Sequence, residues 1–287
     1  MTNYARTFGQ DLMRGEHAVG GGKMPVDSTE KFQARAVGTT EWMRDKGLKG
    51  GCSDGNDGVA SGTSIFDPVL TELCYRWFCP PGGIIADPFA GGSVRGIVAS
   101  VLGFEYHGFE LRAEQVAANE AQADAICPEC PPKWLVGDSA KTMPAWGCNA
   151  DFVFSCPPYG DLEIYSDLPA DLSAMPHAEF LVSYRAIIAA AVAALKPDRF
   201  AAFVVGDFRC KKGFYRNFVG ETVAAFEAAG ARLYNEAILV TAVGSLPVRV
   251  GKQFRSGRKL GKTHQNILVF CKGNPKRAAQ ACEESAA

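Results

Sequence analysis

Residues 83–93 read GIIADPFAGGS, a short apolar strand that runs into a glycine turn, which in turn opens a helix. Glycine lets the main chain approach a ligand closely because it carries no Cβ. In open α/β sheets, ligands bind beyond the carboxyl ends of the strands, where such turns lie. This stretch therefore predicts a parallel sheet with a ligand site at its carboxyl edge.

Strand and helix patterns alternate after this stretch, which predicts a doubly wound α/β fold. The predicted strands are Ile84–Asp87, Tyr106–Leu111, Trp134–Gly137, Asp151–Ser155, Phe200–Gly206, Arg232–Val240 and Ile267–Lys272. The predicted helices are Pro68–Phe78, Ser93–Leu102, Ala113–Ala125, Ala178–Leu195 and Phe214–Ala229. No helix is predicted between the last two strands, so we expect an antiparallel edge strand there. The expected fold is a seven-stranded, mostly parallel sheet.

Two acidic residues end the strands that follow the glycine turn. Glu110 ends the second predicted strand, and Asp138 follows the third. A carboxylate at the first position could accept both hydroxyls of a ribose, and one at the second could accept from an adenine amino group. A dinucleotide site would need G-x-G-x-x-G, which Gly91–Gly96 matches poorly, and the Lys of a P-loop is missing. The pattern favours a single nucleoside over a dinucleotide or a nucleotide phosphate.

The fourth predicted strand runs into two consecutive prolines, because residues 151–160 read DFVFSCPPYG. Prolines fix the backbone and so set the directions of nearby carbonyls, while Tyr159 offers a flat face for stacking. An exocyclic base amine is a weak nucleophile because its lone pair is delocalised, so acceptors near its hydrogens would favour reaction. Positioning of the amine and electrostatic stabilisation of the transition state can supply the rest of the rate enhancement. A base inside a duplex would have to flip out to reach such a pocket.

These two segments resemble the motifs of amino-group DNA methyltransferases, which modify adenine N6 or cytosine N4, particularly compact phage or prophage types. Residues 87–93 resemble the cofactor motif of that family, and 155–159 resemble its [Asp/Asn/Ser]-Pro-Pro-Tyr motif. The segment 63–78 is similar to the one that contacts the cofactor ahead of the first strand. The resemblance covers roughly residues 60–275. It implies a Rossmann-like methyltransferase fold, S-adenosylmethionine as the cofactor, and site-specific modification of double-stranded DNA, as in restriction–modification systems.

The resemblance also implies roles for individual residues. The cofactor would contact Thr63, Phe66, Asp87, Pro88, Phe89, Ala90, Gly91, Gly92, Ser93, Glu110 and Asp138, with 87–93 along its methionine part. The target amine would be held by Ser155, Cys156, Pro157 and Pro158, while Tyr159 stacks on the base.

Cys156 departs from the family motif, whose first position is Asp, Asn or Ser. A thiol is a weak hydrogen-bond acceptor, so either Ser155 or main-chain carbonyls compensate, or the reaction differs. Cys156 could instead be the nucleophile of a carbon-5 cytosine methyltransferase, although those enzymes place the cysteine after the prolines. Two further interpretations fit the same motifs: an RNA base amino-methyltransferase, and a decayed protein that binds cofactor or DNA without catalysis.

The composition is that of a globular protein, with 47% hydrophobic residues and a net charge of −1, so the whole chain is not basic. A local basic segment lies within the predicted loop 244–265, where no acid occurs. We expect it to contact DNA phosphates through Arg249, Lys252, Arg255, Arg258, Lys259 and Lys262. The competing interpretation is a solvated loop without a ligand.

The remaining segments yield simpler expectations. Residues 1–62 are predicted to be an irregular arm, 63–275 the methyltransferase domain and 276–287 a disordered tail. The pair Cys127 and Cys130 has no second pair at a suitable spacing, so no metal is expected. The irregular cysteines and the lack of an apolar leader predict a cytoplasmic protein of a bacterial or phage-infected cell, not bound to a membrane, and monomeric or homodimeric.

Overall fold

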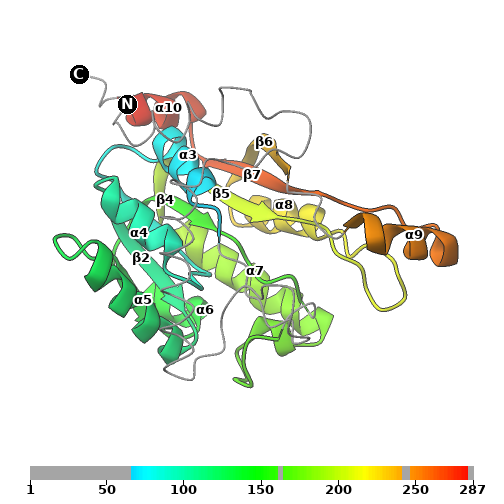
Figure 1. The fold of residues 1–287 in the computed structure, drawn as a ribbon. Helices are drawn as coiled ribbons and strands as arrows, with labels where there is room; N and C mark the ends of the chain where they lie inside the picture. Colours follow the sequence, from blue (N-terminus) through cyan, green and yellow to red (C-terminus); the bar gives the residue numbers. More distant parts are fainter. Residues whose placement is uncertain (1–65, 161–163, 241–245, 284–287) are drawn as a thin grey trace, which may run out of the picture. The chain divides into compact units, whose positions relative to one another are not determined.

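The computed structural model describes residues 66–160, 164–240 and 246–283, without the side chains of 246–249. They form a seven-stranded sheet in the order β3-β2-β1-β4-β5-β7-β6 (Figure 1). The strands are β1 (Ile84–Asp87), β2 (Glu105–Glu110), β3 (Lys133–Val136), β4 (Ala150–Ser155), β5 (Leu195–Val205), β6 (Arg232–Val240) and β7 (His264–Lys272). The predicted fold class is confirmed. The expected arm at 1–62 and the predicted cofactor residue Thr63 lie outside the described residues.

The five neighbouring strands β3, β2, β1, β4 and β5 are parallel to one another, and β7 runs antiparallel to them. β1 pairs with β2 and β4, β3 with β2, and β5 with β4. β7 pairs antiparallel with β5 on one side and with the outermost strand β6 on the other. The carboxyl ends of β1 to β5 consequently meet along one edge, which is where ligands bind in such sheets.

Helices cover both faces of the sheet (Figure 1). They are α3 (Pro68–Phe78), α4 (Val94–Val101), α5 (Ala113–Ile126), α6 (Ser139–Ala145), α7 (His177–Ala194), α8 (Phe218–Ala228), α9 (Leu246–Gly257) and α10 (Pro275–Glu283), with a short 3-10 turn at Leu172–Ala174. One hydrophobic core combines α6, α7 and α8 with Val153 of β4, and the other combines α3, α4, α5 and α10 with Phe152 and Phe154. Successive residues of β4 thus point to opposite cores, as the pleat of a strand requires.

The helix α3 shows how local sequence sets an element boundary. The Asp67 carboxylate accepts hydrogen bonds from the N–H groups of Val69 (2.8 Å) and Leu70 (3.2 Å), and Pro68 occupies the first helical position. These are the preferred residues at a helix start. The predicted helix Pro68–Phe78 is therefore confirmed at both ends.

The helix α7 is the one helix among the described residues that is long and apolar enough to span a membrane. It buries Phe180, Tyr184, Ile188 and Val192 in a hydrophobic core that also contains sheet residues. Its apolar composition is therefore explained by packing against the sheet.

The structure corrects two expectations about the carboxyl-terminal third. The basic segment expected to be a loop contains α9. Pro247 suits a first helical turn, but the dense charge of the segment concealed its helical pattern in the sequence. The predicted disordered tail contains α10, which Asn274 caps by accepting from the N–H of Lys276 (2.9 Å). Ala278 of α10 is fully buried in the second core, so packing stabilises a helix that composition alone did not indicate.

Candidate active site

Ser155 joins two turns of the chain, the glycine bend at residues 87–93 and the proline bend at residues 155–159. Its hydroxyl donates to Oδ1 of Asp87 at 2.5 Å and accepts from the N–H of Phe89 at 3.1 Å. Ser155 ends β4 and Asp87 ends β1, and these strands are parallel neighbours. The two motifs expected to hold cofactor and target base therefore lie side by side at the carboxyl edge of the sheet.

The Asp87 carboxylate is buried in a network that fixes the glycine bend. Its Oδ2 accepts from Nε of Arg95 (2.6 Å) and from the hydroxyl of Tyr106 (2.8 Å). Arg95 also donates to the carbonyls of Phe89 (2.6 Å) and Ala90 (2.9 Å). Burial lowers the pKa of Arg95, but Asp87, Tyr106 and Cys156 together raise it by more, so the guanidinium stays charged. Both oxygens of Asp87 are thus engaged within the protein, and the carboxylate holds the shape of the bend.

The bend itself leaves room for a ligand. Gly91 has a φ of +52°, a conformation that favours glycine. A Cβ built on Gly91 or on Gly92 would have no atom within 4 Å, so the space beside both glycines is open. The carbonyl of Gly91 accepts from the side chain of Asn119 (2.7 Å), a residue of α5 that sequence reasoning missed. Ser93 is held in turn by a hydrogen bond to Gln122.

Glu110 and Asp138 flank the bend on the β2 and β3 side. The Glu110 carboxylate accepts from the N–H groups of Gly91 (2.9 Å) and Arg112 (3.0 Å), and burial raises its pKa against the lowering effect of these bonds. Asp138 caps α6 by accepting from the N–H of Ala140 (3.0 Å). The following residue, Ser139, donates to the carbonyl of Pro88 (2.7 Å). The ends of three neighbouring strands are therefore joined around residues 87–91.

Phe66 lies over the buried ion pair. Its ring centroid is 4.6 Å from Cζ of Arg95 and 5.8 Å from the ring of Phe154. These contacts bring Phe66, just ahead of α3, next to the glycine bend, while its predicted contact with the cofactor stays a prediction.

Tyr159 lies on the other side of Ser155. Together with Phe208 and Phe218 it forms a cluster of aromatic rings, the aromatic wall. Its ring centroid lies 6.3 Å from Phe208 and 6.1 Å from Phe218, edge to face in both cases. Its hydroxyl accepts from the side-chain amide of Gln265 in β7. Burial raises the pKa of Tyr159 above its usual range, and the adjacent Cys156 thiol raises it further, so the hydroxyl stays protonated.

The prolines of the motif complete this side of the site. Pro157 is buried, whereas Cys156 and Pro158 are partly exposed. Gly160 then turns the chain with a φ of +58°, and a Cβ there would lie 3.0 Å from the ring of Phe208. The proline bend is therefore closely packed against the ring of Phe208, which limits the movement of the bend.

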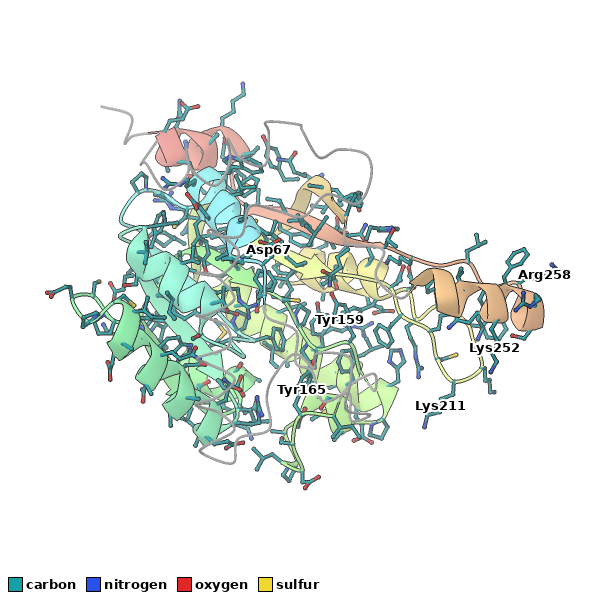
Figure 2. All side chains as sticks on the ribbon, in the orientation of Figure 1. Asp67, Tyr159, Tyr165, Lys211, Lys252 and Arg258 are labelled. Carbon is teal, nitrogen blue, oxygen red and sulfur yellow. The ribbon has the colours of Figure 1, made fainter. Side chains whose placement is uncertain are left out.

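The predicted basic residues divide into two groups. The side chains of Lys252, Arg255 and Arg258 are exposed on and just after α9, and Figure 2 shows Lys252 and Arg258 on that projecting segment. Lys262 is half-buried instead. A Cβ built on Gly206 would lie 3.5 Å from its Nζ and 3.9 Å from Cε1 of Tyr159, so Lys262 reaches the aromatic wall.

The environment of these side chains matches this division. Burial lowers the pKa of Lys262, and Asp207 opposes that change. Lys259 is also partly buried, and the side chain of Arg249 lies outside the described part of the chain.

Among the described residues, no three His, Cys, Asp or Glu side chains form a metal-binding group.

No protein-family model matches this chain, and no curated protein matches it in sequence. Solved structures do resemble it. The TrmN structure from Thermus thermophilus has a TM-score of 0.50 and 16% identity, over 73% of this chain and 50% of that one. This chain thus spans about half the length of TrmN.

Two further structures are similar along nearly their whole length. A TehB-like SAM-dependent methyltransferase from Corynebacterium glutamicum has a TM-score of 0.45 and 16% identity, over 84% of this chain and 99% of that one. Magnesium protoporphyrin IX methyltransferase from Synechocystis, with bound SAM, has a TM-score of 0.46 and 13% identity, over 88% and 100%. At such identities a likeness concerns the fold. The chain has a Rossmann-like α/β fold of the kind found in methyltransferases.

Proposed function

We propose that this chain is an S-adenosylmethionine-dependent methyltransferase that modifies the exocyclic amino nitrogen of adenine or cytosine in DNA. The observation that carries this proposal is the contact of Ser155 with Asp87 and Phe89. Through it, the open glycine bend and the Pro-Pro-Tyr segment lie side by side, as the two halves of one site would. A methyl donor and an acceptor held in these two bends would be neighbours.

The glycine bend fits the proposed cofactor. Open space beside Gly91 and Gly92 lets a ligand approach the main chain. The Glu110 carboxylate accepts two N–H donors, and its remaining lone pairs can accept ribose hydroxyls. Asp138 caps α6 and keeps acceptor capacity for an adenine amine. When bound, S-adenosylmethionine would supply an activated methyl group.

The protein's part in the reaction is to bind and orient the amine. Main-chain carbonyls near Cys156 and Pro157 would accept the two amine hydrogens, which frees the nitrogen lone pair for bond formation. Transfer of the methyl group from the sulfur to the amine nitrogen would leave this nitrogen with one proton too many, which it would lose to water. Tyr159 would stack on the base, because packing by Phe208 and Phe218 and the bond from Gln265 fix its ring. Alignment of this kind supplies much of the catalysis when the donor is already reactive.

DNA is the proposed substrate because exposed basic residues gather on and just after α9, and Lys262, which follows them in the chain, reaches the aromatic wall of the site. Phosphate contacts by Lys and Arg dominate the affinity of proteins for DNA. The net charge of −1 makes this local concentration distinctive.

The test is incubation of the full chain with S-adenosylmethionine labelled in its methyl group, using duplex DNA or folded RNA as acceptor. We expect label in DNA. Label in RNA alone would support an RNA enzyme instead. DNA binding without transfer to either acceptor would support a decayed protein. A Tyr159→Ala variant controls for transfer by contaminating enzymes, because its activity should fall by about tenfold to a hundredfold.

A further inference from the structure

We propose that a small hairpin at residues 208–216 grips DNA beside the target base, with Phe214 stacking against exposed bases. The partner named here rests on the proposed function, but the hairpin is a different surface from the basic segment around α9. Four features of the hairpin support this role: its defined backbone geometry, its exposed aromatic rings, its positive charge and its connection to the aromatic wall.

The hairpin is a structured element rather than a loose loop. Arg209 pairs with Tyr215 in an antiparallel bridge, and the N–H of Arg216 donates to the carbonyl of Phe208 (2.9 Å). At the turn, the N–H of Cys210 donates to the carbonyl of Phe214 (2.8 Å). The side chains at its tip are therefore presented on a fixed backbone.

Two aromatic rings of this hairpin face solvent. Phe214 is 73% exposed, more than any other aromatic side chain in the described part of the chain, and Tyr215 is 47% exposed. The guanidinium of Arg209 lies 3.9 Å from the centroid of Tyr215 and donates to the carbonyl of Gly213 (2.8 Å), which fixes that ring. Exposed aromatic rings among basic residues are typical of surfaces that stack on nucleic-acid bases.

The charged residues within the hairpin are all positive. Residues 208–216 include Arg209, Lys211, Lys212 and Arg216 and no acid. A Cβ on Gly213 would lie 3.1 Å from Nζ of Lys259, so the hairpin meets the basic segment that follows α9. In Figure 2, Lys211 and Lys252 both extend from this projecting part of the molecule. Two segments about 40 residues apart thus form one basic surface, a complement to a phosphate backbone.

The foot of the hairpin belongs to the proposed active site. Phe208 is buried there, with its ring 6.3 Å from Tyr159. Phe214 lies two residues beyond the pair formed by Phe208 and Arg216, a rise of about 7 Å in strand geometry. That length is comparable to two base steps. A base held against Tyr159 would therefore leave its neighbours in the strand within reach of Phe214.

The test uses binding of a fluorescently labelled DNA duplex to the full chain without methyl donor, so that it does not depend on transfer. Lys211→Glu/Lys212→Glu should weaken affinity about tenfold or more, because attraction to phosphate is replaced by repulsion. The matched control, Lys276→Glu/Arg277→Glu, reverses two exposed charges at the start of α10. α9 and α10 adjoin opposite ends of β7 (Figure 1), and this control should stay within about twofold of the parent.

Stacking by Phe214 is tested separately. With a duplex that contains a short unpaired stretch, whose bases are exposed, Phe214→Ala should weaken binding about tenfold, since base–aromatic stacking has that magnitude, and Phe214→Trp should restore it. DNA should quench the fluorescence added by Phe214→Trp but not that added by Tyr234→Trp on β6. Circular dichroism of each variant confirms folding, which substitution of exposed side chains should leave unchanged.

The outcomes separate this inference from the proposed function. Equal affinity of the hairpin variants and the α10 control, with no selective quenching, would overturn the inference even if the chain methylates DNA. Loss of affinity and selective quenching would support it even if no methyl transfer is found, in which case the proposed function fails alone. Binding of RNA but not duplex DNA would overturn the inference as stated.

Discussion

The hydroxyl of Ser155 donates to the buried carboxylate of Asp87 at 2.5 Å, across the ends of two neighbouring parallel strands. This contact ties the bend proposed for the methyl donor to the bend proposed for the acceptor. Because Ser155 also accepts from the N–H of Phe89, one side chain fixes the relative position of both. The two residues are separated by 68 positions along the chain, so their contact arises from the sheet order and not from local sequence.

Replacement of Ser155 by alanine should destabilise the protein and impair transfer. The Asp87 carboxylate and the N–H of Phe89 would each be deprived of a buried partner, which costs about 1–3 kcal/mol in the free energy of unfolding. Urea unfolding followed by circular dichroism measures this change. Ser183→Ala, at a partly exposed position of α7, is the control. Equal unfolding midpoints for both variants would show that the Ser155 contact contributes little.

Arg95→Gln should lower the free energy of unfolding by about 3–5 kcal/mol, because it leaves the charge of Asp87 buried without its ion-pair partner. The distance from Nε of Arg95 to Asp87 is 2.6 Å, and both side chains are almost fully buried. Adding Asp87→Asn removes that charge and should recover part of the loss. Strictly additive losses in this double-mutant cycle would contradict the coupling.

Tyr159→Ala should lower turnover by about tenfold to a hundredfold while leaving cofactor affinity nearly unchanged, since stacking on one base contributes about 1–3 kcal/mol. Tyr159→Phe keeps the ring but removes the acceptor of the bond from Gln265, so its effect should be smaller. Turnover is measured by methyl transfer and cofactor affinity by calorimetry. A parallel decrease of both quantities would argue that the two pockets are not separate.

Substitution of Lys252, Arg255 and Arg258 together by alanine should weaken DNA binding and flatten its salt dependence. The slope of log affinity against log salt concentration should fall by about 1 for each phosphate that is no longer neutralised. Affinity measured at several salt concentrations gives this slope. A slope equal to that of the parent would mean that these exposed residues do not meet phosphate.

Much of the fold could be predicted because its signals are local. The Asp67-Pro68 start and the Cys79–Gly83 stop determine α3, and the apolar runs of β1 and β4 end at Asp87 and Ser155 as expected. The short helix α6, which contains Pro144, was not predicted either. α9 and α10 were missed for a physical reason. Dense positive charge obscured the pattern of the first, and burial of Ala278 in a tertiary core stabilises the second.

The site could be predicted only as far as its two motifs. Gln265 contacts Tyr159 from 106 residues away, and the ring of Phe208 reaches it from the strand end beyond β5. Such contacts depend on sheet order, which no short pattern encodes. In the sequence, Arg95 falls at an unconstrained position of the segment compared with the dinucleotide motif, so nothing marks it there, whereas the structure makes it the ion-pair partner of Asp87.

The most direct test of the central claim is the identity of the methylated nucleoside. DNA treated with the full chain and S-adenosylmethionine carrying a deuterated methyl group would be digested to nucleosides and measured by mass spectrometry. We predict the label on N6 of adenine or N4 of cytosine, where an amine would meet the methyl donor beside Ser155. Label on carbon 5 of cytosine would contradict this account and indicate Cys156 as a nucleophile.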